Sequence, residues 1–292
     1  MDRSFLCLHL AIFVAGFTGI LGKLITLPEG PLVLYRMFLT TIILAGYFLF
    51  SKKSIRVPVR EMLAICGVGV LVSVHWIFFY GSIKYSNVSI AVVCFALVGF
   101  FTAIVDPFLG RTKISPRELF FSLITVGGIA LIFHFDSRHR VGIILGVLSA
   151  FFGALFTIAM KRVSAKHDSD IVLFYEMAGG FLFLAALAPL YLWLFPGIAI
   201  IPSVSDVLYL LMLSTVCTIG LFLLEIQALR TISAFTANLS FNLEPVYSVI
   251  LAMFLFGEAR ELNTAFFVGM GLIGISVILQ SIYALRQRGG NR

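Results

Sequence analysis

Long apolar stretches separated by short groups of charged residues are the main pattern along this 292-residue chain. Residues 4–22, 62–83, 85–105, 141–160, 177–205 and 262–285 contain no Asp, Glu, Lys or Arg. A helix needs about 20 largely apolar residues to cross the hydrocarbon core of a bilayer. When the more interrupted windows are interpreted in the same way, the pattern predicts an all-α membrane protein with ten transmembrane helices. Their predicted ranges are 4–25, 30–50, 61–83, 86–108, 117–135, 141–161, 171–195, 206–229, 233–256 and 262–285.

The composition supports this prediction and excludes a soluble domain. Hydrophobic residues make up 60% of the chain and charged residues only 12%, with a mean hydropathy of +1.07. The apolar windows are rich in glycine and lack the polar alternation that would line a β-barrel lumen, so helices are the better prediction. The N-terminal apolar run is longer than a signal-peptide core, and we expect it to be a retained first helix.

The distribution of positive charge predicts the orientation. Fifteen Lys and Arg residues fall in the segments on one side of the ten predicted spans, five fall on the other side, and Arg36 lies within a span. Cytoplasmic connections of membrane proteins carry the excess of Lys and Arg, so both termini are predicted to be cytoplasmic. The net charge of +7 is thus explained without a nucleic-acid partner. We expect the chain to be a multi-pass protein of the inner, or plasma, membrane.

The second half of the sequence repeats features of the first. The segment that begins at Ile83 aligns with the one at Leu229 at a constant offset of 146, which places Phe95 on Phe241. LYRM at Leu34 likewise aligns with FYEM at Phe174, at an offset of 140. Residues 4–135 and 141–286 are therefore predicted to be two repeats of five helices each. An odd number of spans per repeat inverts the second repeat relative to the first, as in transporters that work by alternating access.

The segment NLEPVYSVILAMFLFGE, residues 242–258, combines a Leu-x-Pro step with a later Gly-Glu pair. Together with the two five-helix halves, it resembles the EamA type of the drug/metabolite transporter superfamily. The resemblance implies transport of small metabolites, often export of amino acids or related compounds, through a cavity between the halves. In the first half, ALVGFFTAIVDPFLGRT has Gly99 in place of Pro245 and lacks the Gly-Glu pair. Both positions are predicted to interrupt or loosen their helices.

Charged residues at membrane depth are costly and are candidates for function. At about 1.5 Å per residue, Arg36 lies about 9 Å from the outer face and His75 at a similar depth. Glu244 lies near the midplane. We predict that Arg36 approaches Glu244 and offsets the cost of its burial. As alternatives, Arg36 extends to the interface to fix the helix depth, and His75 is either a neutral core imidazole or a proton-transfer group.

Other polar and aromatic residues allow two interpretations each. Trp76 and Tyr80 fit an interfacial aromatic belt or a stacking wall for an aromatic or apolar substrate. Asn238 and Asn242 share one helix face and can bind a ligand or join helices.

Two further acids lie nearer the cytoplasmic side. Glu176, about 8 Å from the cytoplasmic face, and Glu225 are expected to reach cytoplasmic water or to pair with Lys161, Arg162 or Arg230. As the repeat mate of Arg36, Glu176 lies on the opposite side of the midplane, so a direct pair between these two is not expected.

The sequence contains no signature of an enzyme, a metal site or a nucleotide cofactor. It predicts a secondary active transporter that exports a small organic metabolite, an amino acid or related compound, with a proton as a candidate coupling ion. The alternative within transport is a proton-coupled exporter of drugs or lipophilic cations, because 30 Phe residues would supply an apolar cavity. An intramembrane enzyme using His75 with a carboxylate is a third hypothesis.

Overall fold

The computed structural model describes residues 3–110, 116–135, 139–241, 243–260 and 262–289, and all of its regular elements are helical. In chain order they are α1 (Arg3–Ala15), α2 (Thr18–Leu24), α3 (Glu29–Ser51), α4 (Val59–Tyr85), α5 (Val88–Phe95), α6 (Val98–Gly110), α7 (Pro116–Phe135), α8 (Arg140–Ser164), α9 (Ser169–Leu194), α10 (Val204–Ser214), the π-helix η1 (Thr215–Gly220), α11 (Leu221–Leu229), α12 (Ala234–Phe241), α13 (Glu244–Phe256), the 3₁₀ turn η2 (Glu258–Arg260) and α14 (Thr264–Gly289).

The helices have the length and composition of a multi-pass membrane protein. Within the described ranges, seven helical stretches are long and apolar enough to span a membrane: Ser4–Leu24, Glu29–Ser51, Val59–Tyr85, Val88–Leu109, Arg140–Ser164, Ser169–Leu194 and Val204–Leu229. The other predicted ranges contain shorter apolar helical stretches, Ser122–Leu131, Glu244–Phe256 and Thr264–Ser276. Large apolar side chains cover the outside of the bundle, among them Phe50, Trp193 and Phe254, as expected of a surface in contact with lipid.

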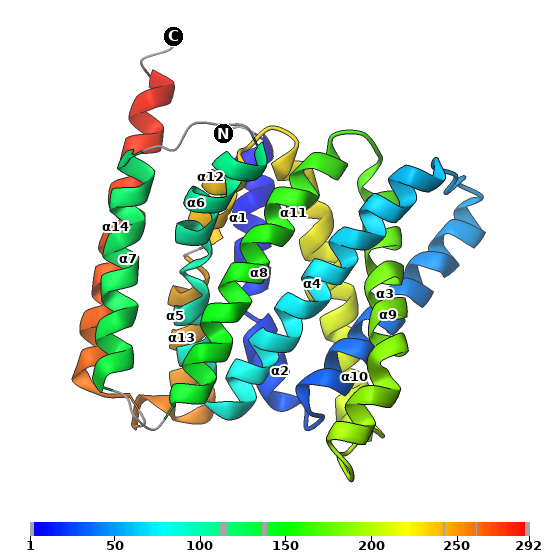
Figure 1. The fold of residues 1–292 in the computed structure, drawn as a ribbon, viewed down its shortest axis with the longest axis horizontal. Coiled ribbons are helices and arrows are strands. Elements are labelled where there is room, and N and C mark those ends of the chain that lie inside the picture. The colour runs from blue at the N-terminus through cyan, green and yellow to red at the C-terminus, as the bar shows by residue number, and fades with distance from the viewer. Residues whose placement is uncertain (1–2, 111–115, 136–138, 242, 261, 290–292) are drawn as a thin grey trace.

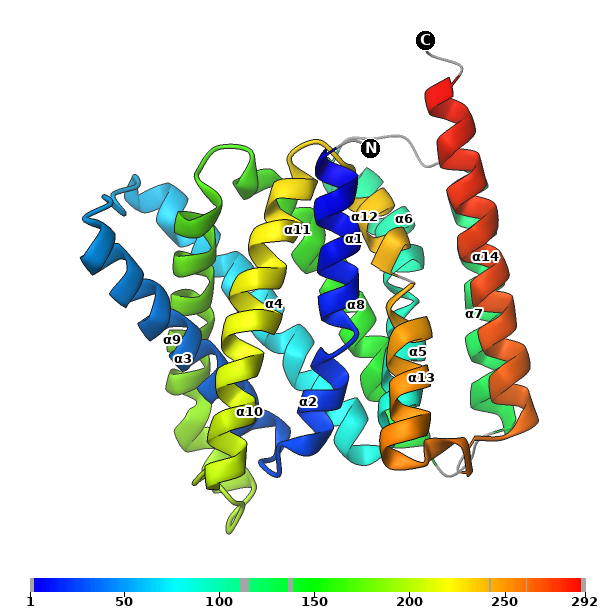
Figure 2. The same cartoon turned by 180° about the vertical axis from the view of Figure 1, so that it is seen from behind.

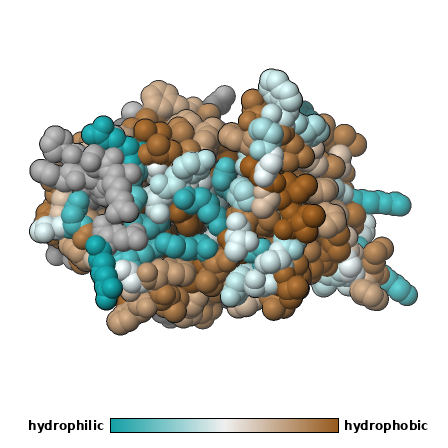
Figure 3. Space-filling model, turned by 90° about the horizontal axis from the view of Figure 1, so that it is seen from below, coloured by the Kyte–Doolittle hydropathy of each residue, from teal (hydrophilic) through white to brown (hydrophobic). Residues whose placement is uncertain are grey.

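The helices run roughly alongside one another between two ends (Figures 1 and 2). The start of α1 and the end of α14 lie at one end, together with the α3–α4 and α8–α9 connections. The α2–α3, α4–α5 and α9–α10 connections lie at the other end. Seen from this second end, hydrophilic side chains gather across the middle of the face, and hydrophobic side chains form its rim (Figure 3).

Helices at equivalent places in the two halves pack against each other. The α3 helix contacts α9, and α7 contacts α14 at one edge of the bundle. The interrupted helices also pair, because α5 contacts α13 and α6 contacts α12. Equivalent helices that lie near a two-fold axis between the halves contact each other in this way.

The α5–α6 and α12–α13 spans break at the same place in the repeat. The α5 helix ends at Phe95 and α6 begins at Val98, while α12 ends at Phe241 and α13 begins at Glu244. The offset of 146 is thus kept at both sides of the break. Pro245 lies in the first turn of α13, where its missing N–H costs nothing. Gly99 occupies the corresponding position at the start of α6, so the predicted interruptions are present in both halves.

Candidate functional site

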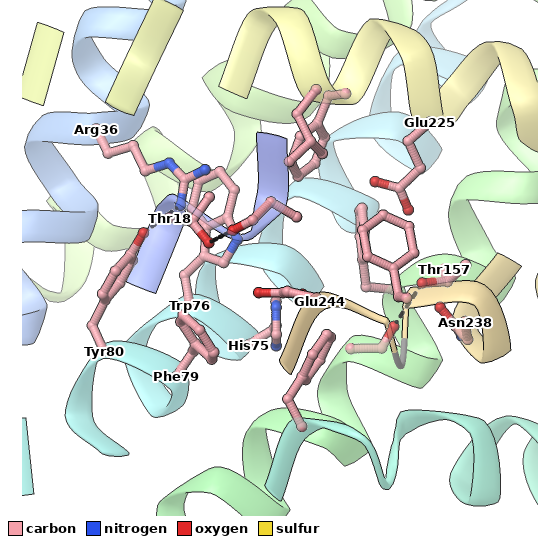
Figure 4. A pocket seen from close by; sticks show the side chains of 17 residues that line it. Thr18, Arg36, His75, Trp76, Phe79, Tyr80, Thr157, Glu225, Asn238 and Glu244 are labelled. Carbon is pink, nitrogen blue, oxygen red and sulfur yellow. Dashed lines mark hydrogen bonds between the residues drawn. The ribbon is translucent and has the colours of Figure 1, made fainter. Parts of the chain in front are cut away.

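A cavity of about 70 Å³ lies between the two halves, with space for several water molecules. Both halves contribute to its lining (Figure 4), which comes from helices α1, α2, α3, α4, α5, α8, α11, α12 and α13. Its charged and polar lining consists of Thr18, Arg36, His75, Tyr80, Thr157, Glu225, Asn238 and Glu244. Its large apolar lining is mainly aromatic, with Trp76, Phe79, Phe95, Phe156, Phe222 and Phe241.

Arg36 is the most completely engaged charge of the cavity. Only 2% of its surface is exposed, and all three guanidinium nitrogens donate. Nε donates to Thr218 Oγ1 at 2.8 Å, Nη1 to the Tyr80 hydroxyl at 2.7 Å and Nη2 to the Cys217 carbonyl at 2.9 Å. The guanidinium carbon also lies 3.5 Å from the centre of the Trp76 ring, within the range of a cation–π interaction.

The π-helical turn η1 supplies two of these acceptors, Cys217 and Thr218. A π-helix changes the register of the backbone hydrogen bonds, and such turns are often found at functional sites. Here Thr218 Oγ1 itself donates to the Leu213 carbonyl at 2.8 Å, so it is fixed while it accepts from Arg36. The local irregularity of the helix therefore positions the guanidinium.

His75 is held from the side away from the cavity. Its Nδ1 lies 2.9 Å from the Ser149 carbonyl oxygen and 3.0 Å from Ser149 Oγ. Because a carbonyl only accepts, this contact places the proton on Nδ1 and leaves Nε2 of the neutral ring as an acceptor. The ring packs against Phe95, with 5.0 Å between the centroids.

The two carboxyl groups of the cavity lack such partners. Glu225 and Glu244 are 5% and 4% exposed, and no described residue donates a hydrogen bond to either of them. They are close enough to interact electrostatically. Glu244 begins α13 at the helix break, while Glu225 comes from α11 and lies farther from Arg36 (Figure 4). The acids of the cavity therefore have no cationic partner among the described residues, and Arg36 is engaged by Tyr80, Thr218 and Cys217 instead.

The remaining predicted residues differ in their placement. Asn238 lines the cavity, and its Nδ2 donates to Thr102 Oγ1 at 2.8 Å, which joins α12 to α6. The same amide thus serves both interpretations, as a lining group and as a link between helices. Asn242 lies outside the described residues.

Three expectations from the sequence are wrong in this structure. Arg36 forms no ion pair with Glu244; its three guanidinium nitrogens donate to Tyr80, Thr218 and Cys217 instead. Arg36 does not extend toward water. Trp76 and Tyr80 do not form an interfacial belt either, because both are buried and line the cavity. Arg36, His75 and Glu244 all line the same cavity.

The sequence pattern did not identify Thr18, Thr157 or most of the phenylalanines of the cavity. One signal was present: Phe95 and Phe241 align in the internal repeat, and both face the cavity. Equivalent positions next to the two helix breaks have equivalent places in the structure. Glu176 and Glu225 were expected to reach water or a basic partner, whereas both are buried without any partner among the described side chains.

Comparisons with known proteins agree with this architecture. A crystal structure aligns over 96% of this chain and 98% of its own, with a TM-score of 0.68 and 19% sequence identity, which shows a shared fold. Among sequences, an uncharacterized transporter of Archaeoglobus fulgidus is 24% identical over 89% of this chain and 91% of its own length. The pseudopaline exporter CntI of Pseudomonas aeruginosa is 24% identical over 52% of this chain and 54% of its own.

The family comparison covers nearly the whole chain. The model of the EamA-like transporter family matches twice, at residues 3–134 and 140–280. Its two matches divide the molecule at the α7–α8 connection, where the internal repeat also divides it. This multi-pass membrane protein belongs to the EamA-like transporter family.

Proposed function

We propose that this transporter is a secondary active exporter of a small organic solute with a positively charged amino group, such as an amino acid or a related compound. The central cavity is its substrate site. The outward direction is supported by the distant relative that is named as an exporter. The two halves would alternate access by moving around this cavity, as inverted repeats do.

The pair of unpartnered carboxyl groups in an aromatic cavity carries this proposal. Glu225 and Glu244 offer acceptors to which none of the described residues donates, and the rings of Trp76, Phe79 and Phe95 line the same cavity. Ammonium groups are attracted both by carboxylates and by aromatic faces. An anionic substrate is less suitable, because Arg36 is already engaged by three hydrogen bonds and by the Trp76 ring.

Proton exchange supplies the energy in this proposal. A carboxyl group with few partners binds a proton or a substrate cation, but the low-dielectric cavity disfavours two bare negative charges. Glu244 lies at the helix break, where a small movement of α13 would change its surroundings. The substrate and the proton would therefore compete for the same acids, which is the basis of antiport.

A proton-coupled exporter of lipophilic cations is the second candidate, and the aromatic lining favours it. Such a cation would interact with the rings and the carboxylates without needing hydrogen-bond donors. The relatives are transporters, which argues against an intramembrane enzyme. We further propose that both termini are cytoplasmic and that the protein lies in the inner, or plasma, membrane, in accord with the charge distribution of its connections.

Reconstituted vesicles test the proposal. Radiolabelled phenylalanine, adenine and tetraphenylphosphonium would be offered with and without a pH gradient. Glu244→Gln is expected to insert and remain monodisperse but to lose at least tenfold in proton-driven transport, or the pH dependence of transport. Glu61→Gln, at the end that carries the termini, is the matched control and should transport like the wild type.

The outcomes separate the candidates. Movement of phenylalanine supports the amino-acid hypothesis, and movement of tetraphenylphosphonium alone supports the lipophilic-cation hypothesis. If Glu244→Gln keeps the wild-type rate and pH profile, Glu244 is a structural residue and the proposed coupling site is wrong.

A further inference from the structure

A third acid, Glu176, lies beside the cavity but does not line it. Its residue surface is 0% exposed, and neither carboxyl oxygen has a hydrogen-bond partner among the described residues. Burial of an ionised carboxylate without donors costs many kcal/mol. The form of Glu176 that this packing tolerates is the neutral one, which carries a proton.

The sequence enforces this burial through a seam of glycines between α4 and α9. A Cβ atom at Gly180 would lie 2.7 Å from the Gly69 carbonyl oxygen, and one at Gly179 would lie 2.6 Å from Cys66 Cβ. Real Cβ atoms do not approach so closely, so only glycine permits this helix spacing. The backbone of Glu176 itself lies against Gly69. A polar residue is thus placed where the two helices approach most closely and where water has least access.

The helices packed against α9 bring few titratable side chains toward this region. The α3 helix contributes Arg36, α4 contributes Cys66 and His75, α8 contributes Lys161, and α11 contributes Glu225. Arg36 and His75 are engaged as described above. Lys161 Nζ donates to the Leu229 and Ile232 carbonyls at 2.9 and 2.5 Å, and Cys66 Sγ donates to the Tyr175 carbonyl.

Glu225 is the charged neighbour that acts on Glu176. Its helix, α11, packs against α9, so a negative charge on Glu225 would act on the Glu176 carboxyl. Glu225 also lines the cavity and interacts with Glu244. The three acids come from α9, α11 and α13.

We propose that Glu176 is a proton-binding site that stores the coupling proton away from the substrate. This proposal rests on the proposed function, because it assigns the proton of the exchange to a specific pair, Glu176 with Glu225. Two neighbouring carboxyl groups titrate as a pair and hold one proton over a wide pH range. When a substrate cation pairs with ionised Glu225, the shared proton is retained on Glu176. When the cation leaves, the uncompensated carboxylate of Glu225 beside Glu244 takes up a proton from the cavity, because two bare negative charges are disfavoured there.

Infrared spectroscopy tests this proposal without any substrate. The purified full-length protein in liposomes would be titrated with acid and base, with the proton as the probe and the carboxylic C=O stretch as the signal. The wild type is expected to show a band of protonated carboxyl that persists at neutral pH. Glu176→Gln should lose part of this band and shift the titration of the rest, while Glu61→Gln should leave the band unchanged.

Two outcomes overturn the proposal. An unchanged band in folded Glu176→Gln would show that Glu176 does not hold a proton. If Glu176→Gln does not insert, Glu176→Asp replaces it as the test, because it keeps an acid at the position. The carboxyl band of Glu176→Asp should shift in frequency. An unchanged band in Glu176→Asp also overturns the proposal. Because no transported solute is involved, the titration can support proton storage even if none of the vesicle probes is moved, so the two proposals fail separately.

Discussion

Arg36 shows how a single charge becomes tolerable at membrane depth. Transfer of a guanidinium from water to an apolar interior is costly unless its donors are satisfied. Here one hydroxyl of α4, one hydroxyl of η1 and one carbonyl of η1 accept from it, and Trp76 covers its face. The residue therefore joins the two halves of the molecule at the wall of the cavity. Its planar fork, rather than its charge alone, suits this role.

Replacement of Arg36 by lysine is the direct test of that role. An ammonium keeps the charge but cannot reach three acceptors in one plane while it covers Trp76. Each charge-assisted bond that is lost should cost about 1.5–3 kcal/mol. Arg36→Lys is therefore expected to lower the thermal midpoint in detergent and to reduce transport in vesicles. Arg60→Lys, at an exposed position, is the control; equal midpoints for the two variants would show that the fork is not needed.

The depth of each charged residue could be predicted from the sequence, but its partner could not. Counting residues from the ends of an apolar window gives the position along the membrane normal, and it placed Arg36 and His75 at a similar depth; both line the cavity. It gives no rotation about the helix axis, which decides that Arg36 faces Tyr80 and η1 instead of Glu244. The same limit explains Glu176. Its depth near the cytoplasmic face suggested contact with water, but the close packing of its helix excludes water from the side chain.

At the scale of the elements, Glu258 joins three helical segments at the end opposite the termini. Its carboxylate accepts from the backbone N–H groups of Val88 and Ser89 at 3.1 and 3.0 Å, and so caps α5. It also accepts from Ser89 Oγ at 2.6 Å and from Lys23 Nζ at 3.0 Å. Negative charge is favoured at a helix N-terminus. The Gly-Glu pair recognised in the sequence thus holds η2, α5 and α2 together.

The acid dependence of this junction can be predicted. Burial by itself would raise the pKa of Glu258, but the hydrogen bonds from Ser89 and the ammonium of Lys23 outweigh it and hold the pKa below its ordinary value of 4.5. A carboxyl whose pKa is lowered on folding stabilises the folded state above the unfolded pKa, and this contribution is lost as the pH falls through the folded pKa.

Glu258→Gln should therefore be less stable than the wild type at neutral pH, by about 1.5–3 kcal/mol for loss of the charged hydrogen bonds. The difference should shrink below pH 4.5. Thermal unfolding in detergent across this range measures it, with Glu29→Gln as the control acid at the same end. A difference that stays constant down to strongly acidic pH would contradict the assignment.

Helix positions were predicted well from hydropathy, and helix interruptions only in part. Pro245 indicated the break in the second half, because proline cannot continue a hydrogen-bonded ladder. The break after Phe95 has no proline and was inferred only through the repeat and Gly99. The π-helical turn η1 had no signal in the sequence at all, and two of its residues contact Arg36 of another helix.

At the scale of the whole molecule, polar links occur in matched pairs at opposite ends. Asp206 of α10 accepts from the backbone and hydroxyl of Thr26 in the α2–α3 connection, at 2.6 and 2.8 Å. Glu61 of α4 pairs with His167 in the α8–α9 connection at 2.7 Å. In the five-helix repeat, α4 and the α10–α11 helix occupy equivalent places, as do these two connections. Equivalent contacts at opposite ends of the bundle are what an inverted repeat predicts.

Labelling of cysteines tests this inversion and the proposed orientation together. After Cys7, Cys66, Cys94 and Cys217 are replaced by alanine, single cysteines would be placed at Ser54 and Ser205, both of which are exposed. Ser54 lies in the α3–α4 connection at the end that carries the termini, and Ser205 lies near the α9–α10 connection at the other end. Because the connections at the first end carry the excess of Lys and Arg, that end should face the cytoplasm.

A membrane-impermeant maleimide added to intact cells should label the cysteine at 205, and the cysteine at 54 should react only after the membrane is opened. Labelling of both from the same side would contradict the inverted arrangement, and exchange of the two patterns would keep the inversion but reverse the orientation.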